Sequence, residues 1–306
     1  MSGEKNTKSK KTSKAEKVFN ICIVAALCAA IVFGLVMAVI NAVKPKTAGN
    51  AETSQTETAE LEKPDFGEGL TEEGFIEGIE DETKYVELRF DINEPIEVPA
   101  SVVYVSDGDV EDEENRLVQQ YGDDMSVFNE TFIKEQLESD LTVEEYAEKI
   151  RNDLIRDKKA EYVEDYIIHG YYTLDVPDTY IDTQIKYIKY VDQLNLQYIN
   201  NMYLQLTGTV GYEDVYAYRG ILAEDYEQTV SDEADISVVE FLAYQLLFKK
   251  LGLEITQADI DAFILENDIL YTYTDYGMPY IKKQIMRELV NKTLTDRAVI
   301  VEDQEG

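Results

Sequence analysis

The chain has 306 residues and a formal net charge of −34, with 62 acidic against 28 basic residues. This excess of negative charge excludes nucleic acid as a partner, because its phosphates would be repelled rather than neutralised. The single histidine, His169, lies near the end of a helical pattern and is interpreted as a helix-terminus residue rather than a catalyst. The sequence therefore lacks the residues for a Cys/His or Ser/His/Asp catalytic site. It also has no glycine-rich loop of the type that binds a nucleotide. We expect neither a cofactor nor a metal.

Residues 18–43 form an uncharged run that predicts a transmembrane helix. Within it, residues 21–40 would span roughly 30 Å, the thickness of the bilayer's hydrocarbon core. Eleven of these twenty residues are Ile, Leu, Val or Phe, which together favour insertion by about 3 to 6 kcal/mol. A buried core helix is the alternative, although such helices usually carry a polar stripe. The bilayer is therefore a predicted partner of residues 18–43.

The flanking charges predict the orientation of this anchor. Residues 1–17 carry a charge of +4, which by the positive-inside rule indicates a basic cytoplasmic tail. Residues 44–306 would then be extracytoplasmic and carry −38. Both cysteines, Cys22 and Cys28, lie in the anchor, so the exported part must fold without disulfides. The alternative is a cleaved signal peptide, for which Gly49-Asn50-Ala51 offers a possible cleavage site.

Beyond the anchor, the pattern predicts an acidic flexible stalk at 44–82 and a mainly α-helical domain at 83–306. The stalk is polar and acidic, although Phe75, Ile76 and Ile79 could form a short docking turn. Alternating and apolar residues at 85–90 and 98–105 predict one or two short strands. The tail at 299–301 is expected to form a terminal strand or simply to dock.

Helical periodicity and capping signals predict the remaining elements. Helices are expected at about 107–121, 127–137, 143–169, 179–206, 212–226, 238–251 and 255–264, with a last helix after the loop at 276–279. Asp107-Gly108-Asp109 at the first of them has an alternative interpretation as a calcium loop. The later ligand positions and the closing glutamate of such a loop do not follow, so the cluster is interpreted as a helix start.

The helix predicted at 179–206 is apolar over more than half its circumference. A candidate surface for binding apolar segments of client proteins is its tyrosine-rich stripe, formed by Tyr187, Val191, Leu194, Tyr198 and Met202. Ile181, Ile188, Ile199 and Leu206 widen the apolar side. The alternative is a helix packed on two sides within a bundle, so the stripe is either open or core.

Three stretches of the exported part resemble the C-terminal chaperone domain of bacterial trigger factor, which shares its helical architecture with the periplasmic chaperone SurA. The stretch at 85–123 (YVELRFDINEPIEVPASVVYVSDGDVEDEENRLVQQYGD) is similar to the segment before the family's isomerase domain, and 129–185, with its Val176-Pro177 helix entry, is similar to the segment after it. The third stretch, made of residues 238–267 together with 275–303, is similar to the closing helices. The resemblance implies a helical body with arms and a small β element.

The departures from the family matter for function. Only a few residues separate Gly122 from Asn129, where the family inserts an FKBP-type prolyl isomerase, so isomerase activity is not implied. A membrane anchor replaces the ribosome-docking domain. The resemblance therefore implies a membrane-tethered, ATP-independent holdase or folding helper for unfolded exported polypeptides, and not an enzyme. The alternatives are a scaffold or accessory subunit that holds one fixed partner at the outer membrane face and, third, a degenerate prolyl isomerase.

Overall fold

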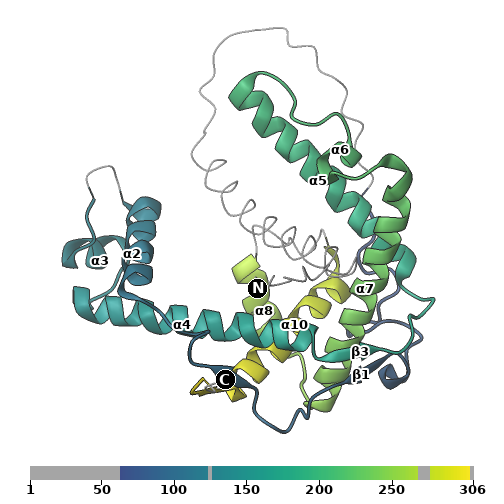
Figure 1. Cartoon of the computed structure of the whole chain (residues 1–306), viewed down its shortest axis with the longest axis horizontal. Helices are drawn as coiled ribbons and strands as arrows, with labels where there is room; N and C mark the ends of the chain where they lie inside the picture. Colours follow the sequence, from purple (N-terminus) through teal and green to yellow (C-terminus); the bar gives the residue numbers. More distant parts are fainter. Residues whose placement is uncertain (1–62, 123–125, 268–275, 304–306) are drawn as a thin grey trace, which may run out of the picture. The chain divides into compact units, whose positions relative to one another are not determined.

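The computed structural model describes residues 63–122, 126–267 and 276–303 (Figure 1). This part of the chain is mainly helical, as predicted, and belongs to one compact unit, Glu60–Gly306. The predicted tail, the anchor at 18–43 and the stalk up to residue 62 lie outside the described residues. No helix within the described ranges is long and apolar enough to cross a membrane.

The elements follow one another with two minimal sheets between them. In chain order they are η1 (Glu82–Lys84), β1 (Val86–Leu88), β2 (Glu97–Pro99), α2 (Asp107–Tyr121), α3 (Glu130–Gln136), α4 (Val143–Ile168), β3 (Tyr171–Thr173), α5 (Ile181–Thr207), α6 (Val215–Arg219), α7 (Ala223–Lys250), α8 (Gln257–Asn267), α10 (Met278–Arg297) and β4 (Val299–Val301).

Capping residues fix where several helices begin, as the sequence predicted. Ser106 accepts from the backbone N–H of Asp109, whose side chain accepts from the N–H of Ser106 in return. Thr142 and Glu145 form the same reciprocal box at the start of α4. Each box satisfies donors that a helix start leaves unpaired. Asp109 thus serves as a capping residue, and no described cluster of three or more His, Cys, Asp or Glu residues could hold a metal ion.

The structure corrects the division predicted for residues 212–251. Of the helix expected at 212–226, residues 215–219 form α6, which Gly220 caps in the left-handed region (φ 66°), and residues 223–226 are the first turn of α7. The expected helix at 238–251 is the second half of α7, which begins at Ala223. The sequence pattern changes within α7 because its first half is buried on one side and its second half on every side.

The strands are shorter than predicted, and each pairs with a strand that is distant in the sequence. Of the run expected at 98–105, only Val98 and Pro99 are strand residues. The terminal segment is a strand, with Val98 opposite Ile300 in a parallel pair of β2 and β4. The sequence missed β3, which follows α4 and pairs antiparallel with β1. Three-residue strands carry too little periodicity to be recognised before their partners are known.

The core is organised around α7, which is labelled in Figure 1. Every residue from Phe241 to Phe248 is buried. The helix contacts α5, α10, β1 and η1, and α10 also packs on α4 and α8. Away from this core, α2 and α3 contact α4, where Val105, Val110 and Ile150 form a separate buried cluster.

Residues 63–82, predicted as the second half of the stalk, are packed onto this core. Phe66, Leu70 and Ile76 are buried, and the backbone N–H of Ile76 donates to Gln245 Oε1 on α7 at 3.1 Å. Glu82 is also buried and accepts hydrogen bonds from Gln245 and Lys249. The folded body therefore begins before the predicted boundary at residue 83. The sequence suggested only a short docking turn here because its apolar residues are sparse.

We predict that a fragment of residues 83–306 melts at least about 10 °C below a fragment of residues 60–306. The shorter fragment loses the burial of Phe66, Leu70 and Ile76, each worth about 1.5 to 3 kcal/mol, and exposes the surfaces of α5, α7 and α10 beneath them. Circular dichroism at 222 nm during heating measures the difference. Glu82→Gln in the longer fragment should cause a smaller loss, and equal melting temperatures for the two fragments would show that residues 63–82 contribute nothing.

Candidate functional site

One side of α5 is buried against α6 and α7. Leu196 joins Val215 and Val230 in a hydrophobic cluster, with Ile188 packed against it. In the same interface the buried Asp192 accepts a hydrogen bond from the Tyr226 hydroxyl at 3.0 Å. We call the unit formed by α5, α6 and the first half of α7 the α5–α7 hairpin.

An ion-pair network fixes the turn of this hairpin. Arg219, in the last turn of α6, contacts Glu233 on α7 at 2.5 Å and Asp192 on α5 at 3.4 Å. Burial raises the pKa of Asp192, while the charge of Arg219 and the hydrogen bond from Tyr226 oppose that rise. Moving one of the three helices away would separate these charges and leave a buried charge without its partner, which is costly. The network therefore holds the three helices in their relative positions.

The predicted client-binding stripe lies beside this interface. Helical geometry turns it by roughly a third of a circle from the buried side. Leu194 is exposed, Val191, Tyr198 and Met202 are half-buried, and these four belong to none of the hydrophobic clusters formed by described residues. Tyr187 differs, since its ring contacts Phe66 and Tyr280 and it lines a cavity. The stripe is therefore a partly accessible flank rather than one uniform surface.

The largest exposure of apolar side chains on the α5–α7 hairpin is at the end of α5. We define the hairpin tip as Tyr203, Leu204, Leu206 and Val210, which are 38%, 51%, 76% and 60% exposed. Leu206, which widens the predicted apolar side of the helix, is exposed because α6 begins only at Val215 and contacts α5 farther back. The tip was not predicted from the sequence, because an apolar helix end has the same residue types whether it is exposed or covered by another element.

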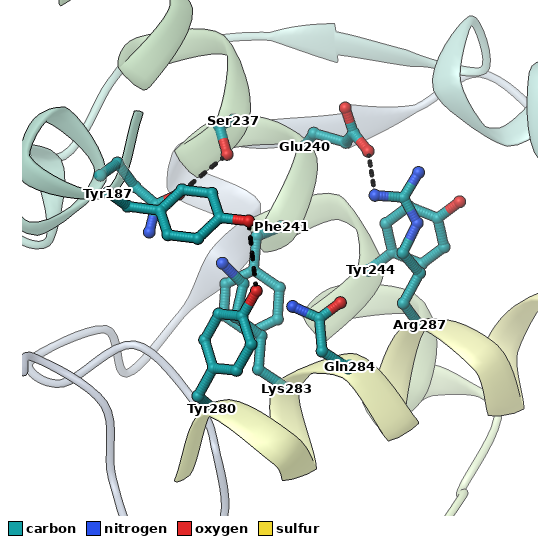
Figure 2. A pocket seen from close by; sticks show the side chains of 10 residues that line it. Tyr187, Ser237, Glu240, Phe241, Tyr244, Tyr280, Lys283, Gln284 and Arg287 are labelled. Atoms are coloured by element: carbon teal, nitrogen blue, oxygen red, sulfur yellow. Dashed lines mark hydrogen bonds and ion pairs between the residues drawn. The ribbon is translucent and has the colours of Figure 1, made fainter. Parts of the chain in front are cut away.

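A polar cavity of about 220 Å³ lies where α5, α7 and α10 meet (Figure 2). Tyr187 and Gln184 come from α5, Ser237, Glu240, Phe241 and Tyr244 from α7, and Tyr280, Lys283, Gln284 and Arg287 from α10. Gln184 accepts from the Ser237 hydroxyl at 3.1 Å, and the Tyr187 and Tyr280 hydroxyls are 3.4 Å apart. Sequence reasoning identified only Tyr187 among these residues.

The two cations of the cavity have different partners. Arg287 contacts Glu240 at 2.9 Å and Glu164 of α4 at 2.8 Å. Lys283 is half-buried, and aromatic rings surround its ammonium, with the centroids of Phe241 and Tyr180 at 4.7 Å and 5.1 Å. Burial lowers the pKa of Lys283 to about 7, an effect that Glu240 opposes and Arg287 reinforces. The cavity therefore holds an amine that changes charge near neutral pH.

We predict that the unfolding free energy of residues 60–306 rises by up to about 1.4 kcal/mol per pH unit between about pH 7 and 8.5, below the range in which the tyrosines of the unfolded chain begin to ionise. In this window the unfolded chain keeps the Lys283 proton while the folded chain releases it, so higher pH favours folding. Urea unfolding at several pH values measures the slope. Lys283→Met should flatten it, whereas Lys282→Met, whose parent lysine donates to the Glu72 carbonyl, should retain it. An unchanged slope in Lys283→Met would contradict the assignment.

The hairpin tip and the cavity are separate features, one apolar and exposed, the other polar and partly enclosed. They lie at opposite ends of α5, since Tyr187 lines the cavity near the start of the helix and Leu206 lies at its end. No protein-family model, curated protein or solved structure matches this chain. Any function proposed for it therefore depends on the geometry of these two features.

Proposed function

We propose that this chain is a membrane-anchored, ATP-independent chaperone that holds unfolded or partly folded exported polypeptides. The observation that carries the proposal is the hairpin tip, where four large apolar side chains within eight positions face solvent. Exposed apolar residues gathered in one region of a soluble protein mark partner-binding surfaces more often than single scattered ones do. If residues 18–43 form the predicted anchor with its N-terminus in the cytoplasm, the tip would lie on the outer side of the cell membrane.

The construction of the hairpin suits a holdase. The tip is carried on a helix of 27 residues that is buried along one side against α6 and α7, so the exposed groups are presented by a rigid support. Leu and Tyr side chains at the tip and along the half-buried stripe would each contribute weak contacts to an unfolded chain. Release then needs no nucleotide, and the charge of −38 predicted for the exported part limits self-association.

The alternative is a scaffold or accessory subunit that holds one fixed partner at the outer face of the membrane. A tip confined to one end of α5 would also fit a single complementary surface. A pull-down in mild detergent separates the two proposals, because one stoichiometric partner supports the scaffold and many substoichiometric ones support the chaperone. A degenerate prolyl isomerase is the third alternative. It would be excluded if the protein did not accelerate a refolding reaction that is limited by proline isomerisation.

We predict that residues 60–306 suppress aggregation of a chemically unfolded model protein at near-stoichiometric ratios without ATP, as measured by light scattering. The triple variant Leu204→Ser, Leu206→Ser, Val210→Ser should lose at least half of the suppression while keeping its helical circular dichroism, because these side chains are exposed. The control is Tyr104→Ser with Val127→Ser, two residues at 68% and 66% exposure outside the hairpin.

A second triple variant tests the stripe itself. Tyr187→Ser, Tyr198→Ser, Met202→Ser should weaken suppression if the stripe also binds clients, and unfolding of this variant would instead show that these residues are core. No suppression by the folded wild-type fragment would favour the scaffold. Full suppression by the tip variant would show that clients bind elsewhere.

A further inference from the structure

The cavity beside α10 contains a cation that has no carboxylate partner among the described residues. The Lys283 ammonium makes no ion pair within 4 Å there, and its one polar contact is the Tyr180 hydroxyl at 3.5 Å, a weak hydrogen bond. Arg287, one helical turn along α10, is paired with two carboxylates. Buried charges in proteins are normally paired, so the Lys283 side of the cavity lacks an anion.

The remaining cavity wall is suited to an organic ligand rather than to a bare ion. Phe241 and Tyr280 present ring faces around the Lys283 amine (Figure 2). Gln284, which also lines the cavity, has an amide with no hydrogen bond to another described residue, so it is available as a donor. A volume of about 220 Å³ is below the usual range for drug-sized ligands and suits a molecule of amino-acid size.

We propose that this cavity binds a small monocarboxylate, with the carboxylate paired to Lys283 and the apolar part against Phe241 and Tyr280. The Lys283 amine, when protonated, carries one positive charge that pairs with one carboxylate. Glu240 faces the same space from α7, but Arg287 binds its carboxylate at 2.9 Å. The carboxylate would therefore contact Lys283 on the side turned away from Glu240. A free acid and the C-terminus of a peptide both supply such a carboxylate.

The charges around Lys283 make proton uptake a signature of this ligand. The groups that face the amine are Glu240 and Tyr244 of α7, Tyr280 and Arg287 of α10, Tyr187 of α5, Tyr180 just before α5 and, through Arg287, Glu164 of α4. Because burial lowers the pKa of Lys283 to about 7, the amine of the empty cavity is mostly neutral at pH 8. A bound carboxylate favours the ammonium, so binding at pH 8 should take up a proton.

The test uses the full chain in mild detergent at pH 8 and isothermal titration calorimetry. The probes are 3-phenylpropionate and its uncharged amide. We expect at least tenfold tighter binding of the acid, and loss of this preference in Lys283→Met. The control Lys282→Met should keep the preference, because Lys282 does not line the cavity and donates to the Glu72 carbonyl.

A second measurement decides the matter if Lys283→Met does not fold. Titrations of the wild-type chain in buffers of different ionisation enthalpy should show uptake of at least half a proton per bound acid. Equal binding of acid and amide, no binding of either, no proton uptake, or a preference retained in Lys283→Met would each overturn the proposal. A peptide ending in phenylalanine, as free acid or amide, identifies the source, since carboxylate-dependent binding of the peptide supports a C-terminus and binding of the small acid alone supports a free metabolite.

Discussion

Burial of the second half of α7 is the constraint on which the rest of the fold depends. Its residues from Phe241 to Phe248 are buried, so the fold must cover this helix on every side. α5 and α10 contact it, β1 contributes the buried Val86, and the segment before η1 adds Leu70 and Ile76. Gln245, the polar residue in this run, is satisfied by Ile76 and Glu82, which ties residues 63–82 to the core.

The same helix supports the hairpin by a different pattern. In its first half only Tyr226, Val230 and Ala234 are buried, which are spaced four residues apart and form one side. α5 uses its own buried side to meet them and leaves the neighbouring flank partly accessible and the tip exposed. The apolar residues of α5 therefore have two roles. Some pack against α6 and α7, and the holdase proposal assigns client binding to those that stay accessible.

The cavity arises where three helices meet without filling the space between them. Long side chains, Lys283 and Arg287 among them, line it in place of apolar core residues, and the cost of burying their charges is offset only for Arg287, through Glu164 and Glu240. Tyr180, beside the amine, also adopts a left-handed backbone (φ 69°) that is unfavourable for a bulky residue, and its ring packs against Gly69. Both features are unfavourable locally and are held in place by the surrounding core.

The sequence by itself determined the helical class, the starts of α2 and α4 and the helix-terminal place of His169, because caps and periodicity act over one or two turns. Tertiary structure decided which apolar residues are core. Ile76 and Leu206 have similar side chains, yet one is buried against α7 and the other lies at the exposed tip, since exposure depends on segments distant in sequence. In the sequence, Lys283 looks like an ordinary helix lysine. Only the tertiary structure shows that the rings of Phe241, Tyr180 and Tyr280 surround its amine. The pairing of β1 with β3 and the docking of residues 63–82 are likewise long-range, so no local pattern could have specified them.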